Sequence, residues 1–97
     1  TYSNDIAYVI NYVILNRIFG LINVANTGET TRLEMGNIFL KKLGIDVELN
    51  SITTQSLNRP AKRPLYSSLE TNTLNIVTGI SMRNWQDALE EHIEKFK

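Results

Sequence analysis

The chain has 97 residues, no cysteine, and ten basic residues that balance ten acidic ones. This length suits one small domain. A net charge near zero gives no bulk attraction to nucleic acid or to an anionic membrane surface, and the lack of cysteine excludes disulfides and thiolate metal sites. No apolar run approaches the ~20 residues of a membrane-spanning helix. We therefore expect a cytoplasmic protein with no nucleic-acid or membrane partner.

The first segment is predicted to form a helix from about Asn4 to Phe19. Ser3 and Asn4 are good capping residues, Asp5 favours the first turn, and Gly20 is a typical left-handed stop. The apolar surface of this helix is broad, which predicts burial on more than one side. One predicted face consists of Ile6, Val9, Ile10, Val13 and Arg17.

A strand, a helix and a second strand are predicted next. The short apolar run Leu21–Ala25 follows a glycine, and residues 26–29 have the composition of a turn. Residues 46–50 alternate strictly between polar and apolar, as in a half-exposed strand. A strand–helix–strand order favours parallel pairing through a right-handed crossover. The sequence thus predicts a βαβ unit with two parallel strands.

The helix between these strands has clear signals at both ends. Thr31 and Glu34 have the spacing of a capping box, with Thr31 as the cap and Glu34 reaching back. The apolar stripe continues to about Leu43. Gly44 then ends the helix, and Ile45 is placed to pack back against it.

The stretch from Ser51 to Ser68 is predicted to be irregular. Pro60 and Pro64 hold the backbone extended and forbid a helix. Thr53 or Thr54 is a candidate cap for one short turn before them.

Two helices are predicted at the end of the chain. A short one over about Thr71 to Val77 stops at Gly79, and a longer one begins after Asn84 as its cap. His92 lies on the apolar stripe of the last helix, so we expect a packed histidine rather than a ligand. Trp85 and Phe96 are expected to be core anchors rather than base-stacking groups. The members of the stripe are Trp85, Ala88, Leu89, His92, Ile93 and Phe96. The whole pattern predicts a small α/β domain in which helices flank the βαβ unit.

Several of these stretches resemble the C-terminal part of the dTDP-4-dehydrorhamnose reductases, which are extended short-chain dehydrogenases/reductases. The residues that carry the resemblance are Thr1 to Ala7, Gly20 to Gly28, Arg59 to Leu69, and Gly79 to Phe96. Arg-Pro-Ala-Lys-Arg-Pro at 59–64 is the most specific of these motifs. The likeness covers nearly the whole chain in the right order, although Ile22 stands where an aromatic is common and Glu70 where Asp is usual.

The resemblance implies the C-terminal, substrate-binding subdomain of a Rossmann-type reductase, spanning residues 1–97. Such enzymes reduce a 4-keto sugar carried on dTDP with NADPH or NADH, to give dTDP-L-rhamnose. The expected partners are the dTDP-sugar nucleotide and the protein's own N-terminal Rossmann domain. The resemblance also leaves open a homodimer and a magnesium ion in the complete enzyme.

The motifs that such catalysis needs do not occur in these residues. No glycine spacing matches a Gly-x-x-Gly-x-x-Gly phosphate-binding turn. None of Tyr2, Tyr8, Tyr12 and Tyr66 has a lysine four residues later, so no Tyr-x-x-x-Lys pair is present to protonate a developing alkoxide. Together with the start at Thr1 rather than Met, this predicts a piece of a longer protein that is not catalytic alone. A processed or trimmed whole domain is the alternative.

Arg63 is the first candidate for a substrate contact, with Arg59 and Lys62 beside it on the proline-stiffened loop. An arginine fork suits a diphosphate, and the resemblance implies that an arginine of this region approaches the nucleotide diphosphate. Tyr2 and Ser67 match family positions near the cleft. A solvated basic loop is the competing interpretation, and from composition alone it is the commoner one.

Two other functions stay open at this point. The regulatory subunit of methionine adenosyltransferase is similar in fold and in its Arg-Pro region, and there the domain would serve protein contact. An upstream Tyr-x-x-x-Lys pair would favour the reductase. The third reading is an independent helical interaction module, which would have to fold stably as a monomer without a large apolar patch.

Overall fold

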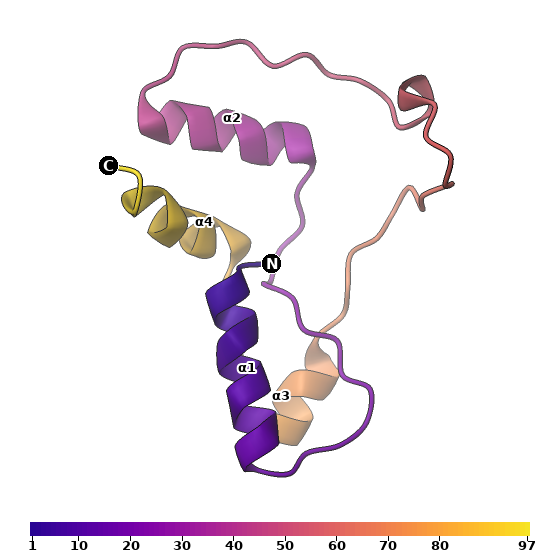
Figure 1. Ribbon diagram of the computed structural model, residues 1–97, viewed down its shortest axis with the longest axis vertical. Coiled ribbons are helices and arrows are strands. Elements are labelled where there is room, and N and C mark those ends of the chain that lie inside the picture. The colour runs from indigo at the N-terminus through magenta and orange to yellow at the C-terminus, as the bar shows by residue number, and fades with distance from the viewer. The chain divides into compact units, whose positions relative to one another are not determined.

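The computed structural model describes all of residues 1–97 and divides them into two units. The first, called here the core unit, joins Thr1–Glu29 with Leu69–Lys97. The second, called the inserted unit, is Thr30–Ser68. Figure 1 shows that helices are the main regular structure of the chain. None of them is both long and apolar enough to cross a membrane.

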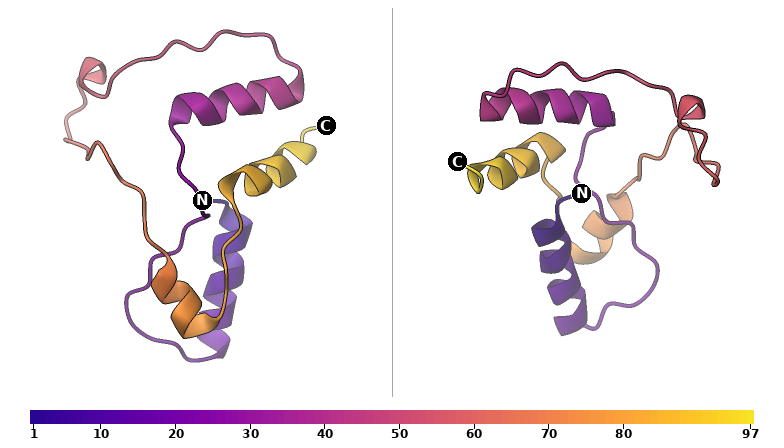
Figure 2. Two further views of the ribbon diagram at one scale, coloured as in Figure 1. Left: turned by 180° about the vertical axis from the view of Figure 1, so that it is seen from behind. Right: turned by 45° about the horizontal axis from the view of Figure 1, so that its top comes forward.

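The core unit is built from the two ends of the chain. It contains α1 (Ser3–Leu15), α3 (Asn72–Thr78) and α4 (Trp85–Glu94), and α3 lies beside α1 in every view of Figures 1 and 2. Each helix contributes at least one buried apolar side chain. These are Val9 of α1, Leu74 of α3, and Trp85, Ala88 and Ile93 of α4.

A single parallel bridge pairs Thr27 with Asn84. The Thr27 amide donates to the Arg83 carbonyl (2.9 Å), and the Trp85 amide donates to the Thr27 carbonyl (3.0 Å). Gly28 follows with a φ of +84°, and a Cβ at this position would lie 2.9 Å from the Trp85 ring. Only glycine combines that backbone conformation with so close an approach. The turn predicted at residues 26–29 is therefore held directly against the start of α4.

The predicted first helix is correct in place but not in its ends. α1 begins at Ser3, with Tyr2 as the cap residue and no side-chain cap, so the predicted caps Ser3 and Asn4 lie inside it. It ends at Leu15 instead of Phe19, because Arg17 adopts a left-handed φ of 52° before Gly20 is reached. Of the predicted inward face, Val9 is buried, whereas Ile10 and Arg17 are exposed.

The later helices match their capping signals more closely. In α4 the Asn84 side chain accepts from the Gln86 amide (2.8 Å), and α3 ends at the left-handed Gly79 as predicted. Glu70 stands where Asp is usual, yet its carboxylate accepts from the Asn72 amide at 2.5 Å. Trp85 is the expected core anchor, but Phe96 is exposed. The prediction for Phe96 was wrong because α4 ends at Glu94, before that residue.

The inserted unit contains α2 (Arg32–Leu43) and the 3-10 turn η1 (Gln55–Leu57). Thr31 caps α2 by accepting from the Glu34 amide (3.1 Å), whereas the Glu34 carboxylate accepts from the Thr30 hydroxyl (2.8 Å). At the other end Gly44 is left-handed, and the Ile45 amide donates back to the Leu40 carbonyl (3.0 Å). These are the predicted start and stop of the helix.

The predicted βαβ unit is not confirmed, because neither strand segment is paired in a sheet. Residues 21–26 and 45–50 are neither helical nor part of a β-ladder. The first segment belongs to the core unit and the second to the inserted unit. Alternation of apolar and polar residues indicates a segment that could form one half-buried strand of a sheet. The segment becomes a strand only where a neighbouring strand completes its backbone hydrogen bonds.

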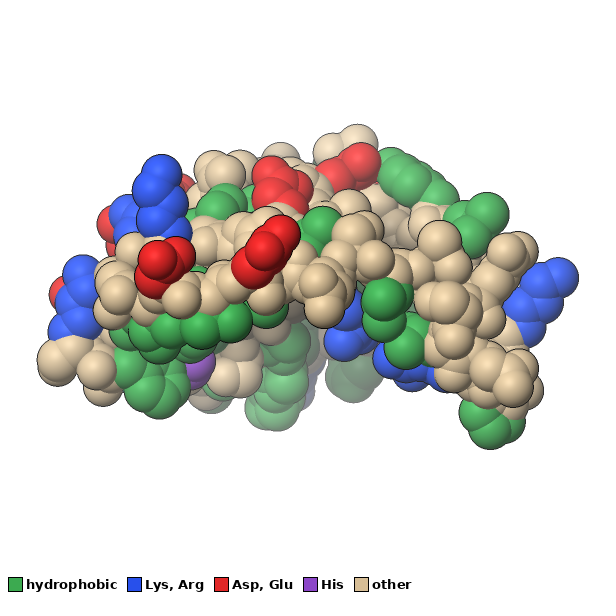
Figure 3. All heavy atoms as spheres, turned by 90° about the horizontal axis from the view of Figure 1, so that it is seen from above, with side chains coloured by type: hydrophobic (Ala, Val, Ile, Leu, Met, Phe, Trp, Pro, Cys, Tyr) green, Lys and Arg blue, Asp and Glu red, His purple; other side chains and the backbone are tan.

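Many large apolar side chains of both units are exposed to solvent. They include Ile14, Phe19 and Leu21 in the core unit and Leu65 in the inserted unit. Figure 3 shows hydrophobic side chains at the surface among polar ones on the face seen from above.

The core of the unit can be tested within α3, where Leu74 is 0% exposed and Ile76 is 81% exposed. Leu74→Ala removes a fully packed side chain and leaves a cavity. We expect this to lower the free energy of unfolding of the full-length protein by about 2–5 kcal/mol. Ile76→Ala is the matched control in the same helix and should cost clearly less. Urea denaturation of both variants makes the measurement, and equal losses would contradict the packing described here.

Candidate functional site

The most connected polar group of the core unit surrounds Arg83, in the segment just before α4. We call it the Arg83 cluster, and its members come from the start of α1, the turn after residue 25, and α4. They are Tyr2, Asp5, Asn26, Arg83, Glu91, His92 and Lys95.

Asn26 is the buried polar residue at the centre of this cluster. Its Oδ1 accepts from the Tyr2 amide (2.8 Å), and its Nδ2 donates to Oδ2 of Asp5 (2.7 Å) and, at 3.3 Å, to the Arg83 carbonyl. One side chain thereby connects three separate segments. Because a buried amide without partners is costly, these contacts fix both the start of α1 and the approach of the chain to the Thr27 bridge.

Arg83 binds Asp5 through a two-pronged pair of hydrogen bonds. Nε donates to Oδ2 (2.9 Å) and Nη2 to Oδ1 (2.8 Å), while Nη1 donates to Glu91 at 2.6 Å. The Asp5 side chain is 17% exposed and that of Arg83 34%. The hydrogen bonds from Arg83 lower the pKa of Asp5, with a smaller contribution from Asn26 and with partial burial opposing the shift. The hydrogen bonds to Asp5 and Glu91 raise the pKa of Arg83, so the guanidinium stays protonated.

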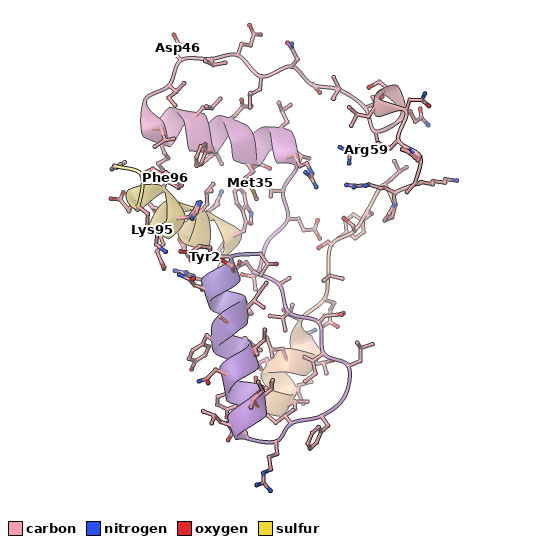
Figure 4. All side chains as sticks on the ribbon, viewed as in Figure 1. Tyr2, Met35, Asp46, Arg59, Lys95 and Phe96 are labelled. Carbon is pink, nitrogen blue, oxygen red and sulfur yellow. The ribbon has the colours of Figure 1, made fainter.

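Tyr2 lies beside this ion pair and receives contacts from His92 of α4 and from Arg83 and Lys95, which flank that helix. Nζ of Lys95 donates to the Tyr2 hydroxyl at 2.5 Å, and the Arg83 guanidinium lies 5.6 Å from the centre of the Tyr2 ring. His92 meets the ring edge-on, with the centroids 5.7 Å apart. Figure 4 shows Tyr2 and Lys95 close to each other. The hydrogen bond to Tyr2 raises the pKa of Lys95, and His92 is the half-buried, packed histidine that the sequence predicts.

The structure distributes the predicted site residues over the two units. Arg59, Lys62, Arg63 and Ser67 are exposed on the irregular segment of the inserted unit, where Figure 4 labels Arg59. Tyr2 belongs to the core unit. The three cations lie on one segment without helix or strand, as the prolines predict, and the chain bends at residues 60–61 between them. A single site containing all five residues stays a prediction.

Sequence reasoning missed Arg83 and its pairing with Asp5. The two residues are 78 positions apart, and neither lies in a periodic pattern that points to the other. The signal was indirect: Asp5 and Arg83 fall in two different stretches that carry the family resemblance, Thr1 to Ala7 and Gly79 to Phe96. No group of three or more histidine or carboxylate side chains is arranged to hold a metal ion, so the magnesium ion left open by the resemblance gains no support.

Comparison with known proteins places these elements in a family. The sequence model of the family called RmlD substrate binding domain matches residues 1–97, the full length of the chain. The chain belongs to this family. This match confirms the resemblance of the sequence to the C-terminal, substrate-binding part of the dTDP-4-dehydrorhamnose reductase family.

One curated relative of this RmlD-type domain is the spore coat polysaccharide biosynthesis protein SpsK of Bacillus subtilis (strain 168). The two are 26% identical over 95 residues, which cover 98% of the chain and 33% of the relative. The chain therefore spans about a third of the length of the curated relative that it matches. No solved structure matches the chain significantly.

The Arg83 cluster gives the RmlD-type domain a pH dependence with a defined sign. Because the folded pKa of Asp5 is lowered, its contribution to stability is fully present above the unfolded pKa of about 3.9 and is lost as the pH falls through the folded value. We expect Asp5→Asn to reduce stability at neutral pH and to flatten the acid limb of the stability curve. Urea denaturation of the full-length protein at several pH values provides the measurement.

Asp46→Asn is the matched control, because Asp46 is an exposed carboxylate on the extended segment of the inserted unit. It should leave both the neutral stability and the shape of the acid limb unchanged. An Asp5→Asn curve that coincides with that of Asp46→Asn would show that the ion pair contributes nothing measurable.

Proposed function

We propose that this chain is the substrate-binding part of an NAD(P)H-dependent reductase that converts dTDP-4-dehydro-L-rhamnose to dTDP-L-rhamnose. The product would supply rhamnose for a cell-surface polysaccharide. The observation that carries the proposal is the family match over all of residues 1–97. The similarity to SpsK, a spore coat polysaccharide biosynthesis protein, supports the same pathway.

The Arg-Pro loop, residues 59–64, is the proposed contact to the sugar nucleotide. It offers three cations on an exposed backbone without helix or strand. The two prolines restrict the backbone of the free loop, so the loop loses less conformational entropy when a ligand orders it. A guanidinium donates two parallel hydrogen bonds in the plane of a phosphate, which is why Arg63 suits a diphosphate better than a lysine would.

The chemistry of hydride transfer is assigned to another part of the polypeptide. Residues 1–97 contain neither the glycine turn for a dinucleotide nor a Tyr-x-x-x-Lys pair. A nicotinamide cofactor would supply the hydride when bound to that other part. The residues described here would hold and orient the sugar nucleotide, with Arg63 and Arg59 at the diphosphate and with Tyr2 and Ser67 near the sugar.

The reaction itself can be tested with the full-length protein. We expect oxidation of NADPH or NADH that depends on dTDP-4-dehydro-L-rhamnose, with dTDP-L-rhamnose identified by mass spectrometry. A chain that binds a protein partner but shows no turnover with either cofactor would favour the non-catalytic, methionine adenosyltransferase-like alternative. The same assay with the corresponding GDP-linked keto sugar tests whether the base is recognised.

The role of Arg63 can be measured by titrating dTDP against variants of the full-length protein. Arg63→Ala should weaken binding by about 1–3 kcal/mol, because it removes a charge-assisted hydrogen-bond donor. Arg63→Lys keeps the charge but loses the planar fork, so it should recover only part of the affinity.

Arg17→Ala is the matched control, because Arg17 is an exposed arginine of the core unit that is not assigned to the site. Its affinity for dTDP should equal that of the unmodified protein. If Arg63→Ala also binds dTDP with unchanged affinity, the assignment of Arg63 is wrong.

A further inference from the structure

Tyr2 is held at its backbone, its ring and its hydroxyl, all within the core unit. Its amide donates to Oδ1 of the buried Asn26 at 2.8 Å. The Arg83 guanidinium lies 5.6 Å from the ring centre, and His92 meets the ring edge-on at 5.7 Å. Figure 4 shows Lys95 beside the same side chain. These partners give Tyr2 one defined position before any ligand binds.

The hydroxyl of Tyr2 receives two hydrogen bonds. Nζ of Lys95 donates to it at 2.5 Å and Nδ2 of Asn4 at 3.0 Å. A phenolic hydroxyl can accept through its oxygen and donate through its single hydrogen. The two contacts occupy the oxygen, so the hydrogen is the bonding capacity that they leave over. Tyr2 is half-buried, while Asn4 and Lys95 are exposed, so the hydroxyl lies within reach of a ligand.

This arrangement suits an acceptor oxygen of a ligand and not a ligand donor. Donors that bind a hydroxyl oxygen polarise the O–H bond and strengthen it as a donor. Arg83 directs its guanidinium to Asp5 and Glu91, so the cluster offers no arginine fork for a diphosphate. A single O–H donor instead fits an uncharged oxygen, such as the hydroxyl or carbonyl oxygen of a sugar.

We propose that the Tyr2 hydroxyl donates a hydrogen bond to an oxygen of the sugar in the sugar nucleotide, and that Lys95 and Asn4 are the positioning residues that direct it. This inference rests on the proposed function, which places the sugar near Tyr2. Lys95 and Tyr2 are 93 positions apart, so the arrangement forms only when the two ends of the chain come together in the core unit.

Titration of the full-length protein with dTDP-L-rhamnose and with dTDP tests the contact. Tyr2→Phe keeps the ring but removes the O–H group. It should weaken the binding of dTDP-L-rhamnose by roughly 3- to 10-fold, the effect of one hydrogen bond, and leave the affinity for dTDP unchanged. An unchanged affinity for both ligands, or an equal loss with both, would overturn the assignment to the sugar.

A double-mutant cycle tests whether Lys95 acts through Tyr2. Lys95→Met should weaken the binding of dTDP-L-rhamnose by about threefold and should have no further effect once Tyr2 is replaced by Phe. Lys97→Met is the matched control, because Lys97 pairs with Glu94 at 3.2 Å, and it should change neither background. Equal losses from Lys95→Met in both backgrounds would exclude a positioning role.

Asn4→Asp tests the direction of the hydrogen bond with little change in shape. A carboxylate can only accept, so it would capture the Tyr2 O–H group internally. An acidic residue is favourable in the first turn of a helix, so α1 should form as before. The variant should lose about as much affinity for dTDP-L-rhamnose as Tyr2→Phe does. Full affinity in Asn4→Asp would show that the Tyr2 hydrogen is not used by the ligand.

The combined outcomes separate this inference from the proposed function. Turnover of the keto sugar together with full affinity in Tyr2→Phe would remove the inference and leave the reductase. Binding of dTDP-L-rhamnose that depends on Tyr2, without turnover, would leave the inference and remove the reductase. An unmodified protein that binds neither dTDP nor dTDP-L-rhamnose would remove both.

Discussion

The ion pair between Arg83 and Asp5 is the constraint on which the core unit depends. It joins residues 78 positions apart through two hydrogen bonds of 2.8 and 2.9 Å, and the buried Asn26 ties the middle of the unit to both. An exposed pair of this kind would contribute little. Here the carboxylate is 17% exposed and has a second donor, so losing one partner would leave a partly buried charge unsatisfied. The geometry thereby fixes where α1 starts relative to the segment that leads into α4.

The apolar packing around this pair is modest. Val9, Leu74 and Trp85 are buried, together with Ala88 and Ile93, and all five lie in the core unit. By contrast, Phe19 and Leu21 are almost fully exposed. These two exposed residues flank Gly20, where the chain enters residues 21–26, which belong to no helix or sheet ladder.

The Arg-Pro loop exposes three cations, which is the charge that the proposed contact to a phosphorylated ligand requires. Residues 1–97 contain neither a dinucleotide-binding glycine turn nor a Tyr-x-x-x-Lys pair. The Arg83 cluster contains a tyrosine and a lysine in contact, but from positions 93 residues apart and within a network that serves the packing of helix ends. The contacts of this cluster hold the start of α1, Asn26 and the two ends of α4 together.

The sequence by itself determined the helices that carry local signals, and the family through the Arg-Pro motif. Thr31, Gly44, Gly79 and Asn84 act through hydrogen bonds to backbone only a few residues away, so their roles can be read from spacing. The ends of α1 at Leu15 and of α4 at Glu94 were mispredicted for a local reason, since neither stop is marked by the glycine that the sequence pattern relies on. The pairing of Asp5 with Arg83 was decided by tertiary structure, because the two residues are 78 positions apart. The strands were overpredicted for the same reason: alternation at 21–25 sets which side chains face inward, but only a neighbouring strand turns that backbone into a sheet.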